Sequence, residues 1–262
     1  MILNEIAEKT KERVAEEKLR LPLSTVRREA ESMDKNTGFP FEKALAADGL
    51  SFICEVKKAS PSKGLIAEDF DFVNIAKDYE KAGAAAISCL TEPYWFRGAD
   101  EYLTEITKNV SIPVLRKDFT VDEYMIYRAK TIGASAVLLI CAILSQNQLN
   151  EYYDIAKSLG LSVLVEAHDE KEIDMALNCG AGIIGVNNRN LKDFTVDINN
   201  SINLRKLVPP EVLYVSESGM KTNEDIARLY HNGVNAVLIG ETLMRSNDKK
   251  AMLDELSKGC KR

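Results

Sequence analysis

Several short apolar stretches of this chain end on a charged side chain. Leu161-Ser-Val-Leu-Val leads to Glu166, and comparable stretches end at other charged residues, namely Lys57, Lys117, Arg189 and Glu217. A carboxylate on an apolar wall tends to have a raised pKa and is suited to proton transfer. A lysine in such a place can act as a general acid, form a Schiff base or bind an anion. The residue types therefore indicate acid-base chemistry, although a structural ion-pair network would use the same ones.

The spacing within the stretches indicates which side chains point the same way. Side chains at positions i and i+2 share one face of a strand, so Glu55 and Lys57 should lie side by side. By the same rule Arg116 faces away from Lys117. We therefore expect Arg116 to form a structural salt bridge with Asp118 or with a helix.

Three further segments are suited to binding more than to proton transfer. Asn187 and Arg189 share a face, and the guanidinium fork of an arginine suits a carboxylate or a phosphate. Ser216-Glu-Ser-Gly219 and Leu238-Ile-Gly-Glu241 contain glycines that permit close approach of the backbone. The carboxylate of Glu241 would repel a phosphate, so we expect this side chain to turn away while its backbone N–H donates.

These side chains can act together only if a scaffold gathers the strand ends. From Leu50 onward, strand and helix patterns alternate along the chain. The predicted strands are Ser51–Val56, Ala85–Leu90, Ile112–Arg116, Ala136–Ile140, Ser162–Val165, Gly182–Val186, Val212–Val215 and Ala236–Ile239. The predicted helices are Val73–Ala82, Ala99–Asn109, Val121–Ile132, Gln146–Leu159, Lys171–Asn178, Ile198–Leu207, Asn223–Asn232 and Lys249–Lys258. Several helices end at a glycine, which is typical of a left-handed C-cap before a turn.

The number of strand-helix units favours a closed barrel among the α/β folds. Eight strand-helix units fit a closed (β/α)8 TIM barrel, whose usual size is about 250 residues. Strands that are hydrophobic from end to end fit burial on both faces. A doubly wound open sheet is the alternative, but the even units and the lack of a glycine-rich dinucleotide loop count against it. In a barrel the active site lies at the carboxyl ends of the strands, and the loops after strands 7 and 8 commonly bind phosphate.

Residues 1–48 differ from the rest because they contain helical patterns and no strand. Apolar residues fall on one face of the first pattern, namely Ile2, Leu3, Ile6 and Val14. Leu21-Pro-Leu breaks this helix, and Ser24–Met33 and Glu42–Ala47 are predicted to be helical again. We expect a single domain over residues 1–262, in which this helical N-terminal extension packs on a barrel formed by residues 49–262.

The composition excludes several classes of protein. A net charge of −6 argues against nucleic acid as a partner, but a local pocket can still bind an anionic small molecule. The apolar runs are shorter than the roughly 18 residues of a membrane span, and the acidic start is unlike a signal peptide. Five cysteines without CxxC spacing indicate reduced core thiols and a cytoplasmic protein. Two histidines without metal-binding spacing predict no metal site, and neither histidine is expected to be functional. His168 should cap the next helix, and His231 should be exposed at a helix end.

Two loops follow predicted strands at the end of the barrel where the active site is expected. The loop Lys58–Asp71 is longer than the 2–6 residues usual between a strand and its helix, which is typical of a lid. Trp95 and Phe96 follow the second predicted strand. They either pack under the N-terminal extension or form one wall of a pocket for an aromatic substrate.

Six motifs together carry a family resemblance. They are Glu55–Gly64, Leu115–Phe119, Val165–His168, Val186–Leu191, Ser216–Gly219 and Leu238–Glu241. In this order and spacing, over essentially the whole chain, they resemble the indole-3-glycerol-phosphate synthases of tryptophan biosynthesis. The resemblance implies a carboxy-lyase that needs no cofactor. It closes the pyrrole ring of a phosphorylated substrate, 1-(2-carboxyphenylamino)-1-deoxyribulose 5-phosphate, with loss of carbon dioxide and water.

The resemblance also implies roles for single residues. Lys117 is similar to the general acid of the family, and Glu166 and Glu55 to its acid-base carboxylates. The substrate-binding residues implied are Lys57 for an anionic end, Ser60, Asn187 and Arg189 for orientation, Phe96, Phe119 and Leu138 as apolar walls, and Ser218, Gly219, Gly240 and Glu241 around the phosphate. A lysine acid needs a lowered pKa, which we expect burial, Lys57 and Arg189 to provide.

Two other functions compete with this interpretation. A phosphoribosylanthranilate isomerase is also a phosphate-binding barrel, but it would be shorter and would use a Cys and Asp pair, whereas Cys54 should face away from Glu55. A non-enzymatic scaffold would need all the charged strand ends to be structural. The sequence leaves the oligomeric state open, with a monomer as the working expectation.

Overall fold

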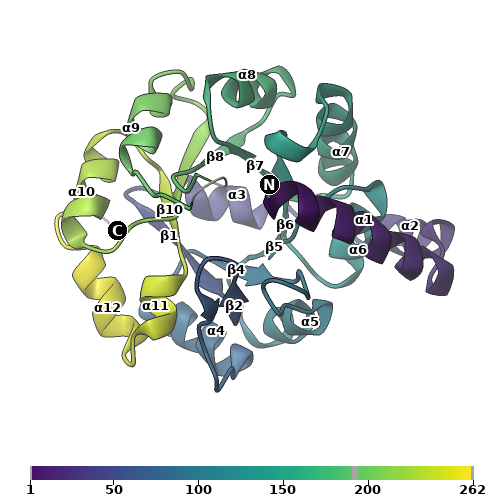
Figure 1. The fold of residues 1–262 in the computed structure, drawn as a ribbon, viewed down its shortest axis with the longest axis horizontal. Helices are drawn as coiled ribbons and strands as arrows, with labels where there is room; N and C mark the ends of the chain where they lie inside the picture. The colour runs from purple at the N-terminus through teal and green to yellow at the C-terminus, as the bar shows by residue number, and fades with distance from the viewer. Residues whose placement is uncertain (1, 191–193, 261–262) are drawn as a thin grey trace.

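The computed structural model describes residues 2–190 and 194–260, and within them eight parallel strands close into a barrel (Figure 1). Neighbouring strands follow the order β1-β10-β9-β8-β7-β6-β5-β4. Their bounds are β1 Ser51–Val56, β4 Ala86–Leu90, β5 Val114–Lys117, β6 Ala136–Ile140, β7 Ser162–Ala167, β8 Ile183–Asn187, β9 Leu213–Glu217 and β10 Ala236–Ile239. The predicted (β/α)8 barrel is therefore confirmed, and the open doubly wound sheet is excluded.

Helices cover the outside of the barrel, so each strand is buried on both faces. They are α4 Phe72–Ala82, α5 Asp100–Asn109, α6 Glu123–Thr131, α7 Gln146–Ser158, α8 Glu170–Asn178, α9 Asn199–Arg205, α10 Asn223–His231, α11 Glu241–Arg245 and α12 Lys249–Leu256. Ile53, Leu115 and Leu164 pack inside the barrel, while Cys54 and Val163 belong to the layer between strands and helices. This two-sided burial is why the strands have continuous apolar sequences.

Several strands extend further than the sequence predicted. The predicted strands Ile112–Arg116, Ser162–Val165 and Val212–Val215 stop before their charged ends, but β5, β7 and β9 run through those ends. Pairing to the neighbouring strands continues there, with Leu90 opposite Lys117, Ile140 opposite Glu166 and Leu238 opposite Glu217. The charged ends are thus held by the backbone ladder, which gives their side chains a rigid base.

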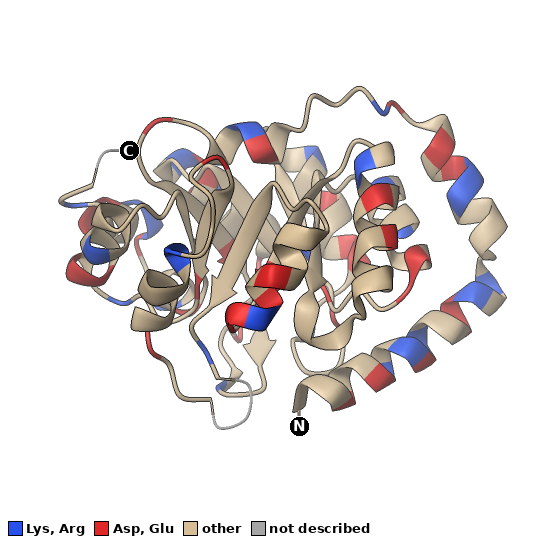
Figure 2. Ribbon diagram, turned by 90° about the horizontal axis from the view of Figure 1, so that it is seen from above, with Lys and Arg blue, Asp and Glu red and all other residues tan. Residues whose placement is uncertain are grey.

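The N-terminal extension consists of α1 Ile2–Arg20, α2 Leu23–Ser32 and α3 Pro40–Leu45. The buried face of α1 includes the predicted Leu3, Ile6 and Val14. In Figure 2, α1 runs from the N-terminus along the side of the barrel and carries alternating acidic and basic residues. Phe41 and Leu45 of α3 are fully buried against the inner residues at the strand starts, so α3 closes the amino-terminal end of the barrel.

Arg13 fastens the middle of α1 to the barrel. Its Nη2 lies 3.0 Å from both carboxylate oxygens of Asp118, directly after β5. Lys18 also binds Asp122 at 2.7 Å. The packing of the extension on the barrel agrees with our expectation, while its membership of one domain over residues 1–262 stays a prediction.

Four short elements were not predicted. The loop Lys58–Asp71 contains a small hairpin of β2 Ala59–Ser60 and β3 Gly64–Leu65, a 3-10 turn η1 spans Cys141–Ile143, and α11 follows Gly240. The last residue of the motif Val186–Leu191 lies outside the described residues. Within the part of the chain that the structure describes, no helix is long and apolar enough to cross a membrane.

Candidate active site

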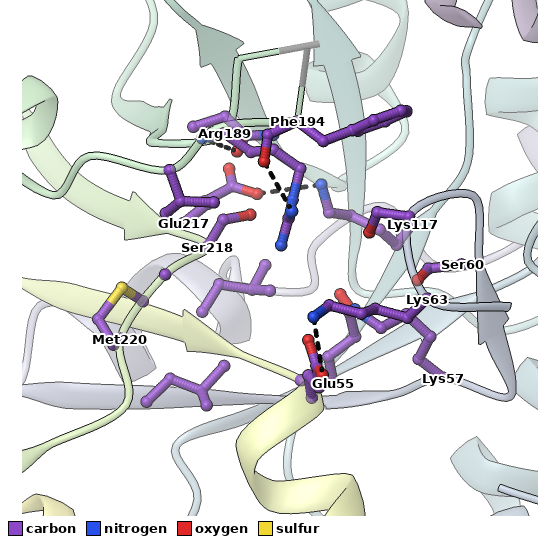
Figure 3. Close-up of a pocket in the computed structure, with 18 of the residues that line it drawn as sticks. Glu55, Lys57, Ser60, Lys63, Lys117, Arg189, Phe194, Glu217, Ser218 and Met220 are labelled. Atoms are coloured by element: carbon purple, nitrogen blue, oxygen red, sulfur yellow. Dashed lines mark hydrogen bonds and ion pairs between the residues drawn. The ribbon is translucent and has the colours of Figure 1, made fainter. Parts of the chain in front are cut away.

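A cavity of about 850 Å³ lies at the carboxyl ends of the barrel strands (Figure 3). Every residue that the sequence placed in the site contributes to its lining, namely Glu55, Lys57, Ser60, Phe96, Lys117, Phe119, Leu138, Glu166, Asn187, Arg189, Ser218, Gly219, Gly240 and Glu241. The barrel topology brings together residues from along the whole chain. Their chemical roles stay predictions, but their common location is a property of the fold.

Lys117 lies at the centre of a buried charge cluster. Its Nζ is 3.0 Å from Glu166 Oε2 and 3.0 Å from Glu217 Oε2. The three side chains are 13%, 4% and 2% exposed, so water screens their interactions poorly. Lys117 is thus a proton donor with two carboxylate acceptors.

The pKa values of this cluster differ from those expected from the sequence. Burial alone would lower the pKa of Lys117, but the carboxylates of Glu166, Glu217 and Glu55 together outweigh burial and raise it. Burial likewise favours a raised pKa for Glu166, yet Lys117 and His168 outweigh burial and lower it. The expected raised pKa of Glu166 and lowered pKa of Lys117 were therefore wrong, because neither expectation included the full set of neighbouring charges.

Glu217 is the carboxylate whose pKa is raised. Burial and the nearby charges of Glu166 and Glu55 raise its pKa to about 7, against the opposing effect of Lys117. The sequence identified Glu217 as a charged strand end but gave it no role in the site. The i and i+2 rule was the available signal, since Val215 belongs to the inner core and Glu217 must share its face.

A second ion pair lies apart from Lys117 in the cavity, toward the base of Figure 3. Lys57 Nζ is 2.6 Å from Glu55 Oε1, which confirms that these two side chains share a face. Gly240 leaves the room for this pair, because a Cβ there would lie 2.7 Å from Glu55 Oε1 and 2.9 Å from Lys57 Nζ. On the other side of β5, Arg116 binds Asp100 at 2.8 Å and lies 3.6 Å from Asp118, as predicted for a structural salt bridge.

Asn187 and Arg189 line the cavity at the end of β8, next to Glu166. Asn187 Nδ2 donates to Glu166 Oε1 at 3.3 Å, and Asn187 Oδ1 accepts from the Arg189 backbone N–H at 3.0 Å. The Arg189 guanidinium donates to the Phe194 carbonyl at 3.3 Å (Figure 3). Asn187 thus orients a carboxylate, and Arg189 presents a cation to the cavity.

An apolar wall lines the part of the cavity beside Lys117. The rings of Phe96 and Phe119 are 5.9 Å apart, and Leu138 also lines the cavity. The buried carboxylate of Glu92 fixes the loop of Phe96, because it accepts backbone N–H bonds from Tyr94, Trp95 and Phe96 at 2.8–2.9 Å. Of the two interpretations, the structure supports the cavity wall for Phe96.

The N-terminal extension completes the cavity. The start of α1 lies over the strand ends in Figure 1, and Ile2, Leu3 and Ile6 add to the apolar lining. Lys9 of α1 lies over the ring of Tyr94, with its Nζ 5.5 Å from the ring centre. The extension therefore contributes to the site itself as well as covering the barrel.

The end of the cavity near β9 and β10 has unusual backbone geometry. Ser218 and Gly219 both have left-handed backbones, with φ of 68° and 96°. A Cβ on Gly219 would lie 2.3 Å from Val196 Cγ1, so only glycine fits there. The carboxylate of Glu241 lies 3.2 Å from Arg245 Nε and 3.7 Å from Lys63 Nζ, which neutralises its charge at the rim.

The two histidines have different surroundings. His231 is exposed at the end of α10, as predicted. His168 was expected to cap α8, but that expectation was wrong, because the N-cap is Asp169, whose side chain accepts from the Glu172 backbone N–H. The His168 ring instead lies between Glu166 and Glu172.

A closed barrel with a charged cavity at the carboxyl ends of its strands defines the class of (β/α)8-barrel enzymes. Comparison with protein families narrows this class. The family model described as indole-3-glycerol phosphate synthase matches residues 3–256. The chain belongs to the indole-3-glycerol phosphate synthase family, and so is an enzyme of the carboxy-lyase class.

Individual relatives agree with this assignment. An indole-3-glycerol phosphate synthase of Ruminiclostridium cellulolyticum is 58% identical over 256 residues, covering 98% of both chains. One of Endomicrobium trichonymphae is 56% identical over 256 residues, covering 98% of this chain and 99% of that one. Among solved structures, a thiamine phosphate pyrophosphorylase from Pyrococcus furiosus has a TM-score of 0.61 at 15% identity, over 83% of this chain and 96% of that one. This last likeness shows the barrel fold alone.

Proposed function

We propose that this chain catalyses the indole-3-glycerol phosphate synthase reaction without a cofactor. In this reaction 1-(2-carboxyphenylamino)-1-deoxy-D-ribulose 5-phosphate yields indole-3-glycerol phosphate, carbon dioxide and water. The observation that carries the proposal is the buried Lys117 held 3.0 Å from two carboxylates at the centre of the cavity. Family membership over residues 3–256 supports the same activity.

The cavity provides two ends at which the substrate can be held. The aromatic ring would pack against the wall formed by Phe96, Phe119 and Leu138. The phosphate would bind near Gly219 and Gly240, where the backbone can approach closely. Holding both ends presses the ring carbon that bears the carboxylate against the ketone carbon. Such positioning can lower the barrier by several kcal/mol, on the order of 7 in favourable cases.

The charge cluster would supply the proton transfers. The new carbon–carbon bond forms as the ketone oxygen takes a proton from Lys117, and carbon dioxide leaves as the ring regains its aromaticity. Lys117 then protonates the departing hydroxyl, which leaves as water, while a carboxylate removes a proton from the neighbouring carbon. Glu166, whose pKa is lowered, is suited to accept this proton.

Two other carboxylates would support this chemistry. We assign Glu55 as the second acid-base group, with Lys57 beside it to neutralise an anionic part of the substrate. Glu217, whose pKa is about 7, exchanges its proton easily near neutral pH. It is suited to return a proton to Lys117 after the first transfer, so that Lys117 can protonate the departing hydroxyl, and to take up a new proton from water between turnovers. Glu166 then passes the proton that it accepted to Lys117, which restores the starting state. Ser60, Asn187 and Arg189 would orient the substrate from the rim.

We propose a phosphorylated small molecule as the ligand, with no nucleic-acid or membrane partner, and a monomer in the cytoplasm. The net charge of −6 supports the exclusion of nucleic acid.

The proposal is tested by adding the carboxyphenylamino-deoxyribulose phosphate to the purified chain and following indole fluorescence, with no metal or cofactor added. We expect indole-3-glycerol phosphate and one equivalent of carbon dioxide. If the folded chain binds inorganic phosphate but forms no product, the chain is still a phosphate-binding barrel, but the synthase activity is rejected.

A further inference from the structure

His168 lies where it can act on Glu166 from behind the cavity. The two residues are separated by Ala167 at the end of β7, so their side chains share a face. The imidazole Nε2 is 3.4 Å from Glu166 Oε1, and Nδ1 is 3.0 Å from Glu172 Oε2. The side chain of His168 is 18% exposed, and it is not among the residues that line the cavity. His168 is thus placed to act through Glu166 without touching the substrate.

The hydrogen bonding of the ring favours the imidazolium form. Among the described residues, the buried Nε2 of His168 has no hydrogen-bond partner. A neutral ring that donates from Nδ1 to Glu172 would turn the lone pair of Nε2 toward a carboxylate oxygen, which is unfavourable. An imidazolium has an N–H on both nitrogens, so each carboxylate then faces a donor.

The charges around His168 agree with this form. Glu166 on β7, Glu172 on α8 and Glu217 on β9 all act on the ring, and Lys117 lies beyond Glu166. Burial lowers the pKa of His168, but the hydrogen bond to Glu172 and the three carboxylates outweigh burial and raise it.

Glu172 holds the ring in place on its far side. Its Oε2 accepts a hydrogen bond from the His168 backbone N–H at 2.8 Å as well as lying 3.0 Å from Nδ1. The position of Glu172 is fixed in turn by the N-cap of α8, where Asp169 accepts from the Glu172 backbone N–H at 3.0 Å. A continuous row of groups therefore runs from α8 through His168 and Glu166 to Lys117.

We propose that His168 is a positioning residue whose imidazolium keeps the Glu166 carboxylate ionised and aimed at Lys117. The proposal rests on the proposed role of Glu166 as the proton acceptor. Asn187 Nδ2 and His168 Nε2 approach the same oxygen of Glu166, at 3.3 and 3.4 Å, while Lys117 takes the other oxygen. Glu166 is thereby held from three sides, and His168 supplies the positive charge on the side away from the cavity.

The charge state of His168 is tested without any activity measurement. The chain has two histidines, so an NMR titration of the imidazole signals can be assigned with the exposed His231 as an internal reference. We expect the His168 midpoint to lie above the ordinary histidine pKa of about 6.5, and Glu166→Gln to lower that midpoint by about one pH unit. A His168 midpoint at or below about 6.5, or one unmoved by Glu166→Gln, would overturn the proposal.

The effect on turnover is tested with His168→Gln, which removes the charge, and His168→Lys, which restores one. We expect His168→Gln to lower kcat about tenfold with little change in KM. In a plot of kcat against pH, the acidic limb should move upward by about one pH unit, because Glu166 then becomes protonated at a higher pH. His168→Lys should move that limb back toward the wild-type position. His231→Gln, on the surface of α10, serves as the matched control and should leave kcat unchanged.

Different results would reject the synthase activity and the positioning role of His168. If the wild-type chain forms no product, the synthase activity is rejected while the NMR titration still decides the charge state of His168. If the wild-type chain is active but His168→Gln has an unshifted acidic limb, the positioning role alone is rejected. A His168 variant that does not fold leaves the decision to the titration of the wild-type chain.

Discussion

Gly185 leaves the space that the buried carboxylate of Glu217 occupies. A Cβ at position 185 would lie 2.3 Å from Glu217 Oε1. The two residues lie on neighbouring strands, with Gly185 in β8 and Glu217 at the end of β9. Glu217 in turn contacts Lys117 at 3.0 Å. The small size of Gly185 therefore determines where the carboxylate of Glu217 lies within the cavity.

We therefore expect Gly185→Ala to lower kcat/KM strongly, by about tenfold or more, because the methyl group would push Glu217 away from Lys117. Gly182→Ala is the matched control, since a Cβ there would meet its neighbours at an ordinary 3.6 Å or more. Steady-state kinetics of both variants make the comparison. Equal activity in the two variants would show that the position of Glu217 is unimportant.

Glu217 should also make stability depend on pH. Its pKa is raised from an ordinary value of 4.5 to about 7, so the folded chain favours the protonated carboxyl. The stability that this preference contributes is fully present below pH 4.5 and is lost as the pH rises through 7. Glu217→Gln keeps a neutral group of similar shape, so it should gain stability relative to the wild type over that range, on the order of 3 kcal/mol.

Denaturant unfolding at several pH values between 4 and 8 measures this difference, with the exposed Glu211→Gln as control. The control should follow the wild-type curve. If the difference between Glu217→Gln and the wild type stays constant from pH 4 to pH 8, then Glu217 does not titrate in this range.

The sequence predicted the barrel well because its physical signals are local. Two-sided burial makes strands such as Ala136–Ile140 continuously apolar, and glycines such as Gly83, with φ of 92°, mark where helices end. The strand ends were predicted less well, since the apolar pattern stops at Lys117, Glu166 and Glu217 while the backbone pairing continues. The start of β5 was misplaced because Pro113 has no N–H for the ladder.

The members of the site could be predicted, but their electrostatics could not. Each strand end reveals its own side chain, whereas the distance between Lys117 and Glu217 depends on how the whole barrel closes. Without that distance, the pKa of Lys117 was expected to fall although Glu166, Glu217 and Glu55 raise it. His168 was misassigned for a related reason, because its partners Glu166 and Glu172 are evident only once α8 has packed beside β7.

Arg13 should stabilise the attachment of α1 to the barrel. It pairs with Asp118, whose side chain is 2% exposed, so Arg13→Met would leave a buried carboxylate with fewer partners. We expect a loss of about 2 kcal/mol in the free energy of unfolding. Lys11→Met removes a cation from an exposed pair on the same helix and should have little effect. Comparable losses in both variants would mean that α1 is not held by Arg13.

Lys57 should act mainly on substrate binding. It lines the cavity, so Lys57→Met would remove the positive charge proposed to face an anionic part of the substrate. We expect KM to rise about tenfold with a smaller change in kcat. The neighbouring Lys58 lies over the ring of Phe70 instead, with Nζ 5.8 Å from the ring centre, and Lys58→Met should leave KM unchanged. An equal rise of KM in both variants would contradict the assignment of Lys57.

The most direct test of the account is a single-turnover measurement of indole-3-glycerol phosphate formation by Lys117→Met. We expect the variant to bind the substrate and to lose at least about 1,000-fold in rate, because its central proton donor is gone. Lys108→Met, at an exposed position of α5, should react like the wild type. A rate for Lys117→Met within a few-fold of the wild type would contradict the central role of Lys117.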